Sequence, residues 1–145
     1  MSKKKKLLCM IIAVIVLVIG GLWFYNKTMY YTVEISDAES INKLVYQQAN
    51  GDVYEITDKD IIKEFINSID GMQFKRDESL ENASWSSSTI YFYNEDNKCT
   101  YSIQPSGNNA IIHGDEPYRY VSDKEYKLDI LAEAGTFVEN IHEQK

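Results

Sequence analysis

The longest hydrophobic segment of the chain is an unbroken run from Leu7 to Phe24 that contains no charged residue. As a helix, its 18 residues would span roughly 27 Å, close to the hydrocarbon thickness of a bilayer. Four lysines, Lys3 to Lys6, precede the run, whereas the other flank carries a single nearby lysine. The positive-inside rule therefore predicts a single-pass protein of the cell membrane: a cytoplasmic basic flank at 1–6, a transmembrane anchor at 7–25 and an extracytoplasmic domain at 26–145.

A cleaved secretory signal combines the same basic and apolar regions, so this alternative stays open. Val18-Ile19-Gly20 could serve as a poor cleavage site, but the apolar run continues beyond it through Leu22-Trp23-Phe24. No A-x-A pattern occurs there. We therefore expect an uncleaved anchor. A cleaved signal, which would make the protein a secreted soluble domain, is the second interpretation, and a buried core helix is the third.

The clearest β unit is a hairpin in which Ile41–Gln48 and Val53–Thr57 flank the dipeptide Asn50-Gly51. Asn-Gly favours a two-residue type I′ turn, because both residues tolerate positive φ. With that loop, Val45 pairs with Ile56, and both side chains are expected to point into the core.

A helix is predicted directly after this hairpin, over Asp58–Asp70. The sequence Thr57–Asp60 resembles a capping box with its threonine as the N-cap. Apolar residues recur every four positions from Ile61 to Ile69 and form one stripe along the helix. Gly71 stands where a left-handed residue commonly ends a helix.

The remainder of the chain is typical of short strands joined by tight turns, followed by a second helix. The expected strands are 31–35, 72–74, 85–93, 98–104, 110–113 and 118–121. A second capping-box pattern at Ser122–Glu125 predicts the start of a C-terminal helix, which Gly135 ends or kinks, and Thr136–Glu139 is expected to add a last helical turn. The predicted fold class is α+β: an N-terminal transmembrane helix, then one antiparallel-sheet domain of about five to seven strands with a helix packed on one face and a C-terminal helix.

Charge and cysteine content narrow the class of protein. Beyond the four N-terminal lysines the chain has 11 basic and 22 acidic residues, a net charge of −11. Such an acidic domain has no electrostatic reason to hold nucleic acid. The two cysteines cannot pair, because Cys9 lies in the anchor and Cys99 in the domain. Cys99 alternates with Tyr101 and Ile103, which predicts a buried small side chain.

The candidates for catalysis or metal binding are weak. His113 precedes Asp115 and Glu116, but one histidine beside two acids on a turn falls short of a metal site. The turn at 94–97 lacks the glycine and distal glutamate of an EF-hand, and His142 is given no role. The chain contains no G-x-S-x-G elbow, P-loop or dinucleotide fingerprint. We therefore predict no enzyme activity, no metal and no cofactor.

Tyrosine is abundant, with 11 residues in the chain. It is enriched at recognition surfaces, and it is equally a good strand former on a half-buried face. If Tyr91, Tyr93, Tyr118 and Tyr120 share the sheet face away from the helix, they form a binding surface.

The segment Ile56–Ile69, the basic-acidic stretch Phe74–Asp77 and the pair around Tyr118–Tyr120 together resemble a known pattern. The chain is similar to small uncharacterised extracytoplasmic domains of Gram-positive bacteria, a family of unknown function carried on single-pass anchors or lipoproteins. That resemblance implies topology and fold, and it transfers no catalytic residue.

The expected function is a membrane-tethered extracytoplasmic domain that binds a protein or another cell-envelope component. The alternative is a receptor for a small ligand or cation that uses the acidic turns at 94–97 and 113–116. A hydrolase ranks last.

Overall fold

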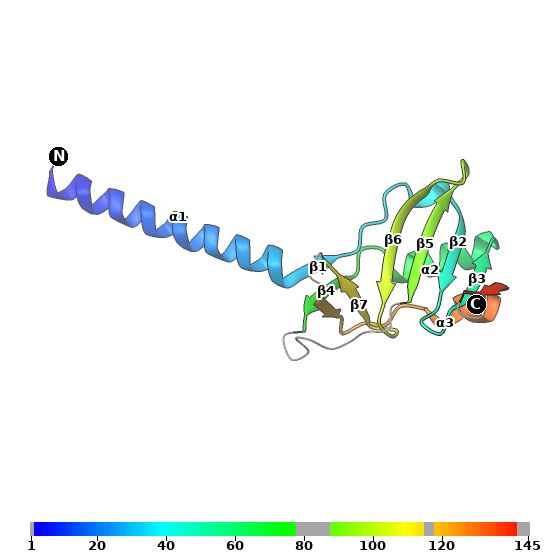
Figure 1. The fold of residues 1–145 in the computed structure, drawn as a ribbon. Coiled ribbons are helices and arrows are strands. Elements are labelled where there is room, and N and C mark those ends of the chain that lie inside the picture. The colour runs from blue at the N-terminus through cyan, green and yellow to red at the C-terminus, as the bar shows by residue number, and fades with distance from the viewer. Residues whose placement is uncertain (1, 78–87, 115–117, 142–145) are drawn as a thin grey trace.

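The computed structural model describes residues 2–77, 88–114 and 118–141. Its helices are α1 (Lys3–Met29), the short 3-10 helix η1 (Ala38–Ser40), α2 (Lys59–Ile69) and α3 (Asp129–Ala134). Its strands are β1 (Tyr30–Thr32), β2 (Ile41–Gln47), β3 (Asp52–Ile56), β4 (Gln73–Arg76), β5 (Thr89–Asn94), β6 (Cys99–Pro105), β7 (Ala110–His113), β8 (Tyr118–Val121) and β9 (Thr136–Asn140). Helix α1 projects from the domain as one long rod (Figure 1).

Within the described residues, the strands form one sheet in the order β1-β4-β8-β7-β6-β5-β2-β3-β9, and every pairing is antiparallel. Strand β6 joins two halves of this sheet, because Ile103 pairs with β5 whereas Gln104 and Pro105 pair with β7. The predicted α+β class is confirmed. The sheet has nine strands instead of five to seven, partly because a segment expected to be helical is a strand.

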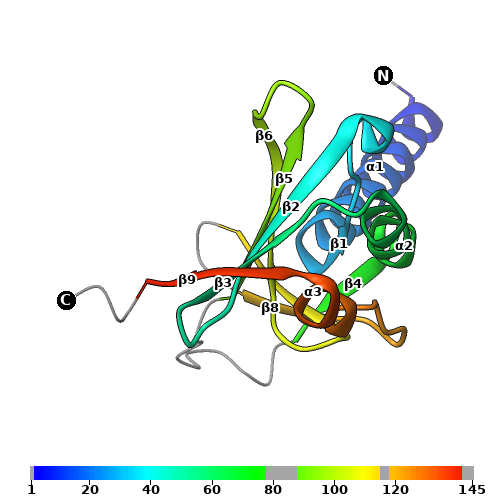
Figure 2. The same cartoon turned by 90° about the vertical axis from the view of Figure 1, so that its right-hand side faces the viewer.

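Helix α2 covers one face of the sheet and supplies much of the core (Figure 2). Its buried residues are Ile62, Phe65, Ile66 and Ile69. The predicted helix is confirmed to within one residue at each end, and Gly71 has the expected positive φ of 75°. The N-cap is Asp58 and not Thr57: its carboxylate accepts from the backbone N–H groups of Asp60 (2.9 Å) and Ile61 (3.2 Å).

The β2–β3 hairpin forms as expected, but its register differs by one residue. The loop has three residues, because Gln48 N–H donates to Asp52 O (2.8 Å) and Gly51 N–H donates to Gln48 O (3.0 Å). Only Gly51 needs positive φ (94°), which is the geometry of a type I turn followed by a bulge. Leu44 therefore faces Ile56 in the core, and Val45 lies on the opposite face.

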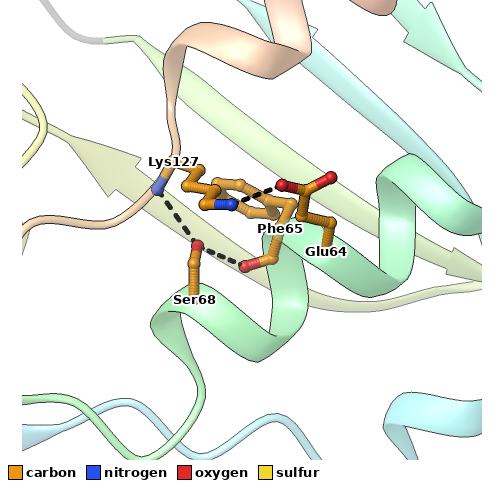
Figure 3. Close-up of polar contacts among 4 residues, drawn as sticks. All are labelled: Glu64, Phe65, Ser68 and Lys127. Atoms are coloured by element: carbon orange, nitrogen blue, oxygen red, sulfur yellow. Dashed lines mark hydrogen bonds and ion pairs between the residues drawn. The ribbon is translucent and has the colours of Figure 1, made fainter.

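The residues before α3 do not form the predicted helical turns. The helix begins at Asp129, and the preceding segment is fastened to α2 by side-chain contacts (Figure 3). Ser68 Oγ accepts from Lys127 N–H (3.1 Å) and donates to Phe65 O (2.7 Å), while Lys127 Nζ pairs with Glu64. This contact with α2 gives the Lys127 N–H a hydrogen-bond partner that a helix would otherwise supply internally.

That irregular segment carries Tyr126 into the core, where it is 2% exposed. Its ring contacts the rings of Phe65 and Phe74, with centroids 6.3 Å away in both cases. Its hydroxyl lies 2.6 Å from Gly107 O and 2.7 Å from Ala110 O, so the single O–H is shared between two carbonyls. Tyr126 thereby ties the β6–β7 turn to α2.

Residues 136–140 form strand β9 and not a helical turn. Gly135 ends α3, as expected, and the reason is space: a Cβ there would collide with the carbonyl oxygen of Leu131 and approach Tyr54 Cβ to 3.0 Å. The chain then pairs with β3, and Phe137 meets Tyr54 at a centroid distance of 5.9 Å. Pairing with an otherwise open strand overrides the local helical pattern.

Burial raises the pKa of Tyr126 above its ordinary value. The folded protein therefore keeps the Tyr126 hydroxyl proton at a pH where the unfolded chain releases it. The contribution of the protonated Tyr126 to the unfolding free energy is complete below about pH 10 and is lost as the pH rises further. We predict that the unfolding free energy of the wild type falls between about pH 10 and 12 more steeply than that of Tyr126→Phe, by up to about 1.4 kcal/mol per pH unit.

Denaturant unfolding at several pH values measures this difference. Phe65→Leu is the matched control, because it loosens the same core without removing a titrating group, and its pH slope should equal that of the wild type. Equal slopes for Tyr126→Phe and the wild type would contradict the prediction.

Candidate functional site

Helix α1 is long and apolar enough to cross a membrane, by length and composition. It has 27 residues, its most apolar 18-residue window has a mean hydropathy of 3.0, and none of that window is buried in the domain. The interpretation as a buried core helix is therefore wrong. A membrane anchor and a signal sequence both fit an exposed apolar helix at this position.

The helix is joined to the sheet without an intervening linker, since α1 ends at Met29 and β1 begins at Tyr30. Met29 is buried at 7% exposure, and Tyr120 Oη donates to Thr28 O at 3.3 Å. Strand β1 occupies one edge of the sheet and pairs with β4. The direction of α1 is thus coupled to the domain by backbone continuity and by side-chain contacts.

An aromatic cluster lies directly beside this junction. Tyr31 Oη and Tyr101 Oη are 2.8 Å apart, and the Tyr31 ring stacks on His113 with centroids 3.7 Å apart. The His113 ring also meets Tyr120 edge-on at 6.1 Å. Burial raises the pKa of Tyr101, and its hydrogen bond with Tyr31 acts in the same direction. The cluster binds β1 to β6, β7 and β8, which is a structural role.

The four tyrosines expected to form one surface are divided between the two faces of the sheet. Tyr120 is part of the core and Tyr118 packs against it, with the Arg76 guanidinium 3.3 Å from the Tyr118 ring centroid. Tyr91 and Tyr93 alternate with the buried residues of β5 and so lie on the opposite face. The structure therefore does not bring the two pairs together.

A groove of about 710 Å³ opens between the end of α1 and strand β4. Tyr25 and Met29 line its helix side, and Lys75 and Arg76 line its strand side. Because it lies where α1 leaves the domain, its shape depends on the angle between the helix and the sheet.

The outer edge of β9 is the second distinctive surface. This strand ends the sheet order and pairs with β3 on one side. Among the described residues beyond α1, the exposed large apolar side chains are Phe137 (55%), Val138 (54%) and Ile141 (40%), all on β9 or next to it. Val138 is the extra residue of a bulge, since Val53 pairs with Glu139 and Tyr54 with Phe137. This surface was not predicted, because the pattern at Thr136–Glu139 is typical of a helical turn.

The described residues contain no group of three or more His, Cys, Asp or Glu side chains that could hold a metal ion. Asp115, Glu116 and His142 lie outside the described residues. The 94–97 segment is a hairpin turn, in which Asn94 Oδ1 accepts from the N–H groups of Asp96 and Lys98.

Cys99 is exposed and not buried as predicted. The β5–β6 pairing shifts register between Phe92 and Tyr93, so the alternation that buries Ile103 does not extend to Cys99.

No protein-family model, curated protein or solved structure matches this chain. The resemblance to Gram-positive extracytoplasmic domains therefore stays a prediction.

We predict that Tyr31→Phe destabilises the domain by about 1–2 kcal/mol, because it leaves the partly buried Tyr101 hydroxyl without its partner. The double variant Tyr31→Phe/Tyr101→Phe should recover part of that loss, since neither hydroxyl then needs a partner. Thermal or denaturant unfolding of the single and double variants measures the coupling. Additive losses of the two single variants would contradict it.

Proposed function

We propose that this protein is a single-pass, membrane-tethered extracytoplasmic domain that binds a protein partner through the outer edge of β9. The observation that carries this proposal is the location of the exposed apolar side chains. Among the described residues, the exposed large apolar side chains lie on α1 and at the far end of the sheet, on Phe137, Val138 and Ile141. Two separate apolar surfaces imply two separate apolar environments.

The orientation follows from charge. Lys3 to Lys6 lie at the start of α1, and no acidic residue occurs in the chain before Glu34. Positive charge next to a spanning helix favours the cytoplasmic side, so the domain lies outside. The aromatic residues Trp23 and Tyr25 near the other end of the helix suit the outer headgroup level.

Partner binding at β9 follows from its position and chemistry. An edge strand can accept a further strand along its backbone, and exposed apolar side chains add contact area. Figure 1 shows β9, in red, at the end of the domain far from α1, so a partner would have access to it. Because the exported part carries a net charge of −11, a partner segment with basic residues is favoured.

The two native cysteines test the topology directly. Cys99 is exposed on the domain and Cys9 lies near the start of α1. We predict that a membrane-impermeant maleimide labels the wild type and Cys9→Ser in intact cells, and that it fails to label Cys99→Ser.

Labelling of Cys99 only after lysis would place the domain in the cytoplasm and contradict the proposed orientation. Intact mass measured on the same samples separates an uncleaved anchor from a cleaved signal. A protein shortened by about one apolar segment and found in the medium would contradict the tether.

Crosslinking tests the β9 edge. A photo-reactive residue in place of Val138, in the full chain in its own membrane, should give a discrete crosslinked product of higher mass. The matched control is the same substitution at Ser102, which is exposed on the central strand β6. We also expect Val138→Asp to reduce crosslinking from a second photo-reactive position at Ile141 by about tenfold or more, because a buried unpaired carboxylate costs more than 1.4 kcal/mol. Equal products from positions 138 and 102, or none from 138, would contradict the proposal.

A further inference from the structure

We propose that a groove between α2 and the segment leading into β2 binds short apolar peptides that carry a free amino group and a free carboxyl group. The groove has a volume of about 380 Å³, which lies within the range of small-molecule sites. Figures 1 and 2 show α2 beside η1 and the start of β2. This site is separate from the β9 edge and from the aromatic cluster around His113.

The apolar part of the groove comes from residues that also belong to the core. Ile62 and Ile66 lie on the buried stripe of α2, and Ile41 begins β2. All three are less than 9% exposed, so their positions are held by packing and need no rearrangement on binding. Only a small part of each side chain is open to the groove, so this preformed floor offers an aliphatic side chain a limited apolar contact at a low entropic cost.

The charged side chains of the groove are segregated by element. Lys59 and Lys63 are one helical turn apart on α2, so they lie on the same side of that helix. Glu39 comes from η1, and Glu95 comes from the turn between β5 and β6. The groove therefore has a cationic side and an anionic side.

These opposite charges do not neutralise each other. None of the four side chains takes part in an ion pair or a side-chain hydrogen bond among the residues that the structure describes. All four are exposed and remain hydrated until a ligand arrives. A ligand with an ammonium group for the glutamates and a carboxylate for the lysines would pair both sets at once.

This pattern selects a zwitterion over a simple cation or anion, because a ligand with only one sign of charge is repelled by one of the two sides. The amides of Asn42 and Asn67 also line the groove and can donate to and accept from peptide groups. A short apolar peptide combines the separated end charges, the amide groups and the aliphatic side chain.

The test uses the full chain in detergent micelles and the tripeptide Ala-Leu-Ala, with binding measured by calorimetry. The doubly blocked peptide, acetylated and amidated, has the same side chains without end charges. We expect the free tripeptide to bind and its blocked form to bind at least about tenfold more weakly. Glu39→Gln and Lys63→Gln should each weaken binding of the free tripeptide about tenfold.

The matched controls are Glu133→Gln and Lys124→Gln, which make the same charge changes at exposed positions outside the groove; they should bind as the wild type does. Both groove residues are exposed, so unfolding temperatures should be unchanged in all four variants. Equal binding of the free and blocked tripeptides, full binding by the groove variants, or no heat with millimolar free tripeptide would each overturn the proposal. Crosslinking from position 138 is independent of these outcomes, so failure here is distinguishable from failure of the β9 interface.

Discussion

The arrangement of this protein depends on the direct fusion of an apolar helix to an edge strand. Helix α1 ends at Met29 and β1 starts at the next residue, so no linker separates the helix from the sheet. The junction of α1 and β1 is stabilised by the hydrogen bond from Tyr120 to the Thr28 carbonyl and by the stacking of Tyr31 on His113. In the proposed topology, the bilayer therefore sets the orientation of the whole domain through one short strand.

The opposite edge of the sheet is formed by β9. Strand β1 occupies one edge of the sheet, and the last strand β9 occupies the other, beyond β3. Among the described residues outside α1, exposed large apolar side chains occur only on β9 and at the adjacent Ile141. A domain held at one edge and apolar at the other is suited to link a membrane to a second protein, which is the basis of the proposed function.

In the core, a single residue of a non-helical segment, Tyr126, makes the contacts that a helix was expected to provide. The sequence predicts a helix before α3, yet the chain there is irregular and packs the Tyr126 ring against Phe65 and Phe74. A buried hydroxyl that meets two backbone carbonyls stabilises a turn far away in sequence. The same packing of α2 against η1 and β2 leaves the groove with its segregated charges.

The sequence by itself determined the elements whose signals are local: the apolar run, the helix over 59–69 with its stripe and its terminal Gly71, and the alternation in β5 that buries Ile90 and Phe92. Only the tertiary structure decided the one-residue register of the β2–β3 hairpin, the exposure of Cys99 and the strand at β9. A loop of two or three residues is equally compatible with Asn-Gly, and bulges cannot be read from alternation. The separation of Tyr91 and Tyr93 from Tyr118 and Tyr120 likewise depends on pairing between distant strands. The β9 surface forms because residues 136–140 pair with the open edge of β3, and the local helical pattern of these residues gives no sign of that pairing.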